Sequence, residues 1–233
     1  MILHQFWLIR HALVHRDSMA FLYGTDDVPV CTQTMAAQCS AYSALAARLP
    51  HPARVVCTPL SRTQLTADAL VRAGYPKHDR LINPAFIEQD FGEWQGVPIS
   101  QFEERNHDER HPFWPIHAAE TPPGGESFTQ MIERVGAGLE ALCNTGARGQ
   151  NTIIVSHGGA IRAACAYAME LTPHQALCLQ IDNISLTRLE HGPRGWRVLS
   201  VNEHSSTPPC QAVADPPFAH VRQEATPTEG VLS

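Results

Sequence analysis

Short apolar runs alternate along the chain with longer segments in which apolar residues recur at helical spacing. Apolar runs of four or five residues that end in polar residues are typical of buried strands. The sequence predicts strands at 5–9, 54–57 and 152–155, an extended segment at 81–88, and two closing strands at 177–189 and 196–201. It predicts helices at 33–49, 61–73, 127–144 and 158–170. Because strands alternate with helices, the predicted class is α/β with a mostly parallel central sheet.

Two of these helices begin with residues that commonly cap a helix. Ser61 is the expected N-cap of the helix that ends before Gly74. Ser127 and Gln130, three residues apart, fit the pattern of a capping box.

A long segment rich in His, Trp and Pro separates the predicted elements at 81–88 and 127–144. Irregular segments of this length inside a domain commonly serve as lids or insertions, so we expect a lid insertion at about 97–122. Residues 205–233 are rich in Pro, Ser and Thr and have little periodicity. The sequence therefore predicts one domain over 1–204, followed by a C-terminal tail.

Charge and cysteine content limit the classes of binding partner and the cellular compartment that we expect for this protein. The formal net charge is -6 and no basic run is present, which argues against nucleic acid or a membrane as partner. The seven cysteines contain no C-x-x-C pair, so we expect neither a disulfide framework nor a structural zinc site. The N-terminus has no charged segment before a long apolar run, so we predict no signal peptide and a cytoplasmic location.

Polar, reactive residues follow three of the predicted strands. Arg10 and His11 follow the first strand, Arg62 lies shortly after the second, and His157 and Gly158 follow the third. Ligands of open α/β sheets bind beyond the carboxyl ends of the strands, so these two histidines and two arginines are expected to share one crevice. Such a cationic crevice in an acidic protein fits a small anion.

A phosphoryl group explains this combination of residues well. Arg10 and Arg62 can bind its oxygens through bidentate, charge-assisted hydrogen bonds. Backbone N–H groups at Gly158 and Gly159 open a helix and can face an anion. The nearby guanidinium charges favour a neutral His11, which can attack phosphorus and form a phosphohistidine. Each residue alone has a structural explanation, such as a tight strand-to-helix turn, but their combination favours catalysis.

Five motifs carry a resemblance to a known family. They are L-I-R-H (8–11), T-P-L-S-R-T (58–63), I-E-Q-D-F-G-E-W-Q-G (87–96), P-P-G-G-E-S-F (122–128) and V-S-H-G-G-A-I-R (155–162). In this order they resemble the histidine phosphatase superfamily, in its phosphoglycerate-mutase-like branch, over roughly residues 4–201. The resemblance implies a three-layer α/β/α sandwich, a phosphohistidine intermediate, no metal and no other cofactor.

The resemblance also assigns roles to single residues. His11 matches the nucleophile, and Arg10, Arg62 and His157 match the remainder of the phosphate pocket. Glu88 matches the acid that protonates the leaving oxygen and then activates water. Without the resemblance, Glu88 would be interpreted as a surface carboxylate in a loop.

Three further positions match the substrate side of the family's site or its support. Tyr23 and Gly24 match a loop at the substrate entrance, where a plain turn is the competing interpretation. Glu126 matches a supporting residue, and compensation of the helix dipole explains it at least as well.

The loop after His11 departs from the family pattern. Ala12 stands where the family usually has Gly, so the backbone there needs ordinary dihedral angles or is strained. Asp17 stands where relatives often have an Asn that binds the transferred phosphoryl group, and an ionised carboxylate there would repel it. We therefore expect either that Ser18 takes over this contact or that the loop is arranged differently.

The expected function is hydrolysis of a small phosphomonoester, similar to α-ribazole 5'-phosphate, with a small phosphorylated metabolite as the partner. A mutase, which returns the phosphoryl group to an acceptor, is one alternative. The short segment between Gly96 and Pro122 and the phosphatase-like W-Q-G pattern argue against it. A phospho-ligand-binding module without catalysis is the other alternative, and the presence of both His11 and Glu88 argues against it.

Two features of the chain leave more than one interpretation. His107, His111 and His117 have irregular spacing interrupted by prolines, so we interpret their segment as a solvated lid rather than a metal site. The oligomeric state is open, with a homodimer as a common outcome for soluble enzymes.

Overall fold

A computed structural model describes residues 3–105, 111–145 and 149–204, without the side chains of 103–105, so the predicted tail at 205–233 lies outside the described residues. The strands are β1 (His4–Arg10), β2 (Arg54–Cys57), β3 (Arg80–Ile82), β4 (Asn151–Ser156), β5 (Leu186–Gly192) and β6 (Gly195–Glu203). The α-helices are α1 (Thr32–Ala37), α2 (Cys39–Arg48), α3 (Ser61–Arg72), α4 (Ile99–Arg105), α5 (Phe128–Thr145), α6 (Gly158–Met169) and α7 (Pro173–Leu177). The short 3-10 helices are η1 (Arg16–Ala20), η2 (Pro84–Phe86) and η3 (Gly92–Trp94).

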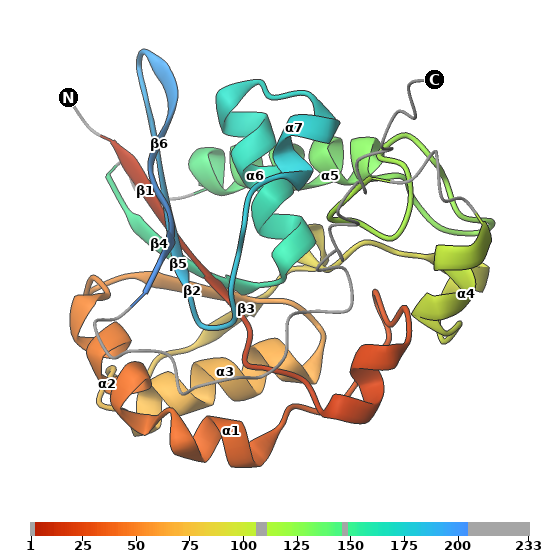
Figure 1. Ribbon diagram of the computed structural model, residues 1–233. Helices are drawn as coiled ribbons and strands as arrows, with labels where there is room; N and C mark the ends of the chain where they lie inside the picture. The colour runs from red at the N-terminus through yellow and green to blue at the C-terminus, as the bar shows by residue number, and fades with distance from the viewer. Residues whose placement is uncertain (1–2, 106–110, 146–148, 205–233) are drawn as a thin grey trace, which may run out of the picture.

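The six strands form one mixed sheet in the order β3-β2-β4-β1-β5-β6. The pairs among β3, β2, β4 and β1 are parallel, and β5 and β6 add two antiparallel pairs at one edge. Helices α5, α6 and α7 cover one face of the sheet, and α1, α2 and α3 cover the other (Figure 1). The predicted α/β class, the three layers and the mostly parallel sheet are confirmed.

Successive residues of the central strands point to opposite layers, as strand geometry requires. In β4, Ile154 packs in the core under α5 and α6, whereas Ile153 and Val155 pack in the core under α2 and α3. All three side chains are at most 1 % exposed. Burial on both faces explains why the central strands are continuous apolar runs.

A third, smaller core lies outside the two layers. Leu22, Phe91, Ile99, Phe102 and Ile116 pack together there, with Trp94 and Trp114 against them. This cluster joins the loop after β1 to the described part of the predicted lid insertion. No helix within the described ranges is both long and apolar enough to span a membrane.

The predicted helix at 33–49 is two helices, because the chain breaks at Gln38 between α1 and α2. The predicted strand at 177–189 is wrong over residues 177–185, since β5 begins only at Leu186. Pro173 at a first-turn position and a capping box of Thr172 and Gln175 start helix α7 instead. The apolar residues after α7 then line a cavity rather than a strand.

The two predicted helix caps had different outcomes. Ser127 and Gln130 form the capping box before α5, with backbone-to-side-chain distances of 2.8 and 3.1 Å. Ser61 is not an N-cap, because Leu60 takes that position and Ser61 is the first helical residue. The Asp27 carboxylate instead accepts hydrogen bonds from both the backbone N–H and the hydroxyl of Ser61, each at 2.8 Å.

Candidate active site

Strand register brings the two predicted histidines together. Arg10 pairs with Ser156 in the parallel β1–β4 ladder, so the residues that follow, His11 and His157, emerge side by side. The His11 backbone N–H donates to the Ser156 carbonyl at 2.9 Å, and the ring centroids of the two histidines lie 5.1 Å apart. The carboxyl ends of the parallel strands therefore form one site, as the sequence predicted.

One nitrogen of the His11 ring is held by the backbone. Nδ1 lies 2.6 Å from the carbonyl oxygen of Ala12, so this nitrogen carries the proton and donates it. A neutral ring then has its lone pair on Nε2. Burial first, and the Arg62 and Arg10 charges next, lower the pKa of His11 well below its usual range. The ring is therefore a neutral, oriented imidazole that can act as a nucleophile.

Arg62 and His157 form a buried hydrogen-bonded unit at the base of the site. Arg62 Nε donates to His157 Nδ1 at 3.2 Å, and its terminal nitrogens donate to the carbonyl oxygens of Gly24 and Asp26 at 2.6 Å each. His157 Nε2 then carries the proton and donates to Thr58 Oγ1 at 3.0 Å. Burial, followed by the Arg62 charge, lowers the pKa of His157 well below its usual range.

Arg10 has an unused donor at the site. Its Nη1 donates to the Ile181 carbonyl at 2.5 Å, but its Nε is buried and has no hydrogen-bond partner among the described residues. A buried donor without a partner costs about 1–3 kcal/mol. A Cβ at Gly158 would lie 3.3 Å from this Nε, so the unpaired donor lies next to the start of α6. An anion oxygen bound there could accept from it.

Glu88 is held at the start of α6 by two backbone N–H groups. Gly159 donates to Oε2 at 3.1 Å and Gln89 donates to Oε1 at 3.0 Å. A side chain at Gly159 would place its Cβ 2.2 Å from Glu88 Oε1, so glycine is required for this approach. The prediction that the Gly159 N–H faces an anion directly is therefore wrong, because Glu88 occupies that donor.

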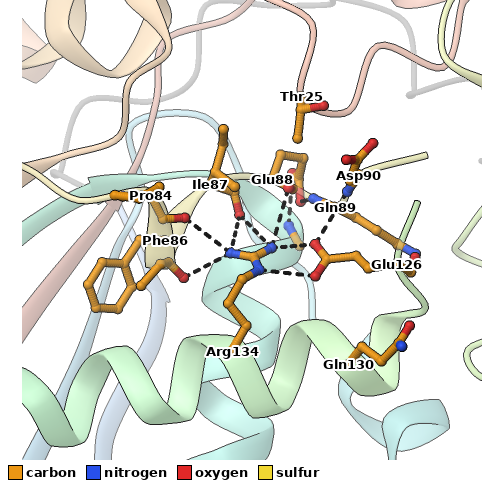
Figure 2. A network of polar contacts seen from close by, with 12 residues as sticks. Thr25, Pro84, Phe86, Ile87, Glu88, Gln89, Asp90, Glu126, Gln130 and Arg134 are labelled. Atoms are coloured by element: carbon orange, nitrogen blue, oxygen red, sulfur yellow. Dashed lines mark hydrogen bonds and ion pairs between the residues drawn. The ribbon is translucent and has the colours of Figure 1, made fainter. Parts of the chain in front are cut away.

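A network around Arg134 positions the Glu88 segment (Figure 2). The Arg134 guanidinium donates to the carbonyl oxygens of residues 84, 85, 87 and 88 and forms an ion pair with Glu126. Glu126 also accepts from the Asp90 backbone N–H at 3.3 Å. Ser127, rather than Glu126, caps the N-terminus of α5. The geometry therefore fits the supporting role that the family resemblance implies for Glu126.

A cavity of about 450 Å³ opens above these residues. Five of the predicted site residues line it: Arg10, Tyr23, Gly24, Glu88 and Gly158. We call Arg10, His11, Arg62, Glu88 and His157 the inner pocket; Arg10 and Glu88 line the cavity, whereas His11, Arg62 and His157 are buried and are not among its lining residues. We call the apolar lining the outer wall, which consists of Met19, Phe21, Leu22, Phe91, Ile99, Phe113, Trp114, Leu177, Leu179 and Ile181.

The entrance loop and the atypical loop after His11 have defined places. The Tyr23 ring lies under the Arg62 guanidinium, 5.3 Å from its Cζ, and Gly24 has a positive φ of 35°. Ala12 is not among the residues with positive φ, and its N–H donates to Thr66 Oγ1 at 2.8 Å. Alanine in place of the family's usual glycine therefore causes no backbone strain here. The Asp17 side chain is 88 % exposed and pairs with His15. Its charge is therefore directed to solvent.

The structure leaves the expectation about Ser18 untested. Ser18 lies in η1, and its backbone N–H donates to the His15 carbonyl at 3.0 Å. It is not part of the cavity lining, whereas its neighbour Met19 is.

The sequence interpretation missed three residues that take part in the site: Arg134, Trp114 and Arg162. Arg162 lines the cavity, donates from Nε to the Leu179 carbonyl at 2.6 Å, and lies over the Trp114 ring at 5.4 Å. Its position one turn after Gly158, on the same helix face, is a signal that could have identified it. Burial and the Arg10 charge lower the pKa of Arg162 to about 10, so it is a cation at neutral pH.

One group of side chains in the described part of the chain could share a metal ion. The ligand atoms of His111, His174 and Cys178 all lie within 4.8 Å of one another. This group is at the rim of the cavity, which Cys178 lines, and contains none of the inner-pocket residues.

Comparisons with known proteins agree with the geometry of the site. A family model described as "Histidine phosphatase superfamily (branch 1)" matches residues 6–204. The Mycobacterium tuberculosis bifunctional protein Rv2228c is 32% identical over 153 residues, which are 66% of this chain and 41% of that protein. A probable phosphoglycerate mutase GpmB of Yersinia enterocolitica is 25% identical over 193 residues, covering 82% of this chain and 87% of that protein. The chain thus spans about two fifths of the length of its mycobacterial relative.

Two solved structures share the fold. A putative α-ribazole-5'-P phosphatase from Escherichia coli K-12 superposes with a TM-score of 0.70 at 18% identity, covering 86% of this chain and 96% of that one. The mycobacterial glucosyl-3-phosphoglycerate phosphatase Rv2419c also gives a TM-score of 0.70, at 21% identity over 86% of this chain and 99% of that one. With the family model covering nearly the whole described fold, the chain belongs to the histidine phosphatase superfamily, branch 1.

Proposed function

We propose that this protein hydrolyses a small phosphomonoester through a phosphohistidine on His11. The observation that carries the proposal is the orientation of the His11 ring, whose Nδ1 is fixed on the Ala12 carbonyl at 2.6 Å. This leaves Nε2 as the lone-pair nitrogen in a pocket with the unpaired Arg10 Nε. The nucleophile and an unsatisfied donor for a phosphoryl oxygen thus occur together.

In the first step, a bond forms between His11 Nε2 and phosphorus while the bond from phosphorus to the alcohol oxygen breaks. Glu88, in its protonated form, gives its proton to the leaving oxygen. In the second step, the Glu88 carboxylate takes a proton from water, whose oxygen binds phosphorus as the N–P bond breaks. Inorganic phosphate leaves, and both His11 and Glu88 return to their starting states.

Arginine charge in the pocket stabilises the phosphoryl group as its charge redistributes. Arg10, Arg62 and Arg162 take part in none of the ion pairs among the described residues. Their positive charges are therefore available to an anionic substrate rather than neutralised in direct pairs.

The outer wall supports an alcohol with an apolar or aromatic body. Phe91, Phe113 and Trp114 offer ring surfaces beside the phosphoryl position. This favours an ester such as α-ribazole 5'-phosphate, which carries an aromatic base, and a solved structure with the same fold is described as a putative α-ribazole-5'-P phosphatase. The cellular partner is then a small phosphorylated metabolite.

A mutase is the second candidate, because several curated relatives are named phosphoglycerate mutases. Incubation of the protein with a panel of phosphomonoesters, including α-ribazole 5'-phosphate and 3-phosphoglycerate, separates the two activities. We expect net release of inorganic phosphate. Interconversion of phosphoglycerate isomers without phosphate release would overturn hydrolysis in favour of transfer.

A further inference from the structure

A cluster of two histidines and one cysteine lies at the rim of the cavity, outside the inner pocket. His174 and Cys178 are four residues apart, at α7 and its C-cap, so they face the same side of the helix. His111 reaches them from the described part of the predicted lid insertion. Its ring centroid lies 4.3 Å from that of His174, and its Nε2 lies 3.7 Å from Cys178 Sγ.

The spacing of these atoms is close to that of a tetrahedral zinc site. Zinc–nitrogen and zinc–sulfur bonds of about 2.0–2.1 and 2.3 Å imply nitrogen–sulfur separations of about 3.5 Å in such a site. The observed 3.7 Å between His111 Nε2 and Cys178 Sγ needs almost no movement. The full set of three ligand atoms within 4.8 Å needs only a small closure.

The chemistry of the three donors selects the class of ion. Two imidazoles and one thiolate suit Zn²⁺, whereas Mg²⁺ and Ca²⁺ require oxygen ligands. We infer that His111, His174 and Cys178 bind one Zn²⁺ ion at the rim of the cavity, with the fourth position open to water.

Zinc binding requires a change of tautomer at His111 and the loss of the thiol proton at Cys178. His111 Nδ1 accepts from the Phe113 N–H at 3.1 Å, and Nε2 lies 3.1 Å from the His174 carbonyl. Coordination through Nε2 moves the imidazole proton to Nδ1, so both of these hydrogen bonds are lost when the metal binds. The Cys178 thiol releases its proton to solvent as it becomes a thiolate ligand.

The proposed zinc site lies between two segments of the chain that line the cavity. Phe113, Trp114 and Pro115, just after His111, line one side of the cavity, and Leu177 and Leu179 flank Cys178 on another. An ion held by His111 and Cys178 fastens these two parts of the outer wall together. The proposed zinc site departs from the expectation of no metal that the family resemblance implied. The spacing of His107, His111 and His117 gave the same expectation for the predicted lid insertion, but the fold places His111 beside His174 and Cys178.

Cobalt substitution tests this site without reference to phosphatase activity. Co²⁺ added to the metal-free protein should give a thiolate-to-cobalt charge-transfer band at one equivalent, and Zn²⁺ should displace it. Mutation of a residue that only hydrogen-bonds to a metal ligand typically lowers metal affinity by about 10- to 100-fold. Cys178→Ser removes a ligand itself, so it should lower the affinity for Co²⁺ by at least about 100-fold. Cys39→Ser, at another exposed free cysteine, is the matched control and should leave the band unchanged.

His174→Asn provides a second, exposed variant, because replacement of the buried His111 risks the fold. It should weaken Zn²⁺ binding while the far-ultraviolet circular dichroism stays that of the wild type. Absence of the cobalt band in the wild type would overturn the site, and so would its persistence in Cys178→Ser. Phosphate release by the same preparations tests the proposed function separately.

Discussion

The inner pocket and the outer wall of the adjoining cavity are built in different ways. Four inner-pocket residues lie at the end of a strand or the start of a helix, and Glu88 lies in the loop after η2. Backbone groups hold His11, Arg62 and Glu88, whereas side chains hold His157. The Ala12 carbonyl orients His11, and two loop carbonyls hold Arg62. The outer wall is mostly apolar and comes from loops and helix ends. The fold thus fixes the reacting groups, whereas loops shape the space for the alcohol.

The largest effect should come from removing the nucleophile. His11→Ala should lower kcat by about ten-thousand-fold or more on every substrate, because no other group in the pocket can form the N–P bond. Phosphate release measures this, and His15→Ala, at a half-exposed histidine outside the inner pocket, is the control. Near-normal activity of His11→Ala would contradict the assignment of the inner pocket.

Glu88→Gln should separate the two steps of the reaction. The amide cannot donate the proton to an alkoxide, so kcat on alkyl phosphates should fall by about 100- to 10,000-fold. p-Nitrophenyl phosphate needs no proton donor for its good leaving group, so a burst of nitrophenol should survive with this variant. An equal loss of the burst and of alkyl ester turnover would argue against Glu88 as the acid.

Arg162 lies where the inner pocket meets the outer wall. Arg162→Met should lower kcat/KM by about 10- to 100-fold, because a charge-assisted contact to the substrate anion is worth about 1.5–3 kcal/mol. Arg188→Met is a matched control, since Arg188 also lies over a tryptophan ring, Trp7, but is outside the cavity lining. If both variants lowered kcat/KM equally, Arg162 would have no special role in binding.

The Arg134–Glu126 pair connects stability to the placement of Glu88. Glu126→Gln should lower the free energy of unfolding by about 1–3 kcal/mol, because it leaves the guanidinium without its counter-charge. Denaturant unfolding measures this change. Asp68→Asn, which removes a carboxylate that is 41 % exposed from its pair with Arg80, should cost less than about 1 kcal/mol. The reverse order would contradict a supporting role for Glu126.

The buried histidines predict a pH dependence of stability. The pKa values of His11 and His157 are lowered in the folded state, so the unfolded chain binds more protons below about pH 6.5. Stability should be fully present above that pH and fall as the pH decreases toward the folded-state pKa values. Each histidine contributes up to about 1.4 kcal/mol per pH unit, so His157→Asn should reduce the slope measured by denaturant unfolding between pH 6 and 5. An unchanged slope would contradict the neutral, buried state of His157.

The contrast between the two regions also explains what the sequence could predict. Strand ends with Arg10, His11 and His157 follow from the apolar periodicity and from the parallel order, so these three inner-pocket residues could be predicted from the sequence pattern. Glu88 was predicted only through the family resemblance. Arg134 was not predicted, because its role depends on four backbone carbonyls whose directions only the folded chain defines.

The wrong predictions about the fold also involve residues whose partners lie far away in the sequence. The apolar residues after Thr172 suggested a strand, but a capping box and Pro173 start a helix there, and tertiary packing places the following residues around the cavity. Ser61 has the residue type of an N-cap, yet the distant Asp27 carboxylate binds its N–H. Local preferences do not reveal such long-range partners.

The central claim is a covalent bond between phosphorus and His11. Rapid acid-free quenching during turnover of a phosphomonoester, followed by peptide mass spectrometry, tests it most directly. We expect a phosphoryl group on His11 that is stable to alkali and lost in acid, and that is absent from His11→Ala. A phosphoryl group on another residue, or rapid turnover with none trapped on any residue, would contradict it.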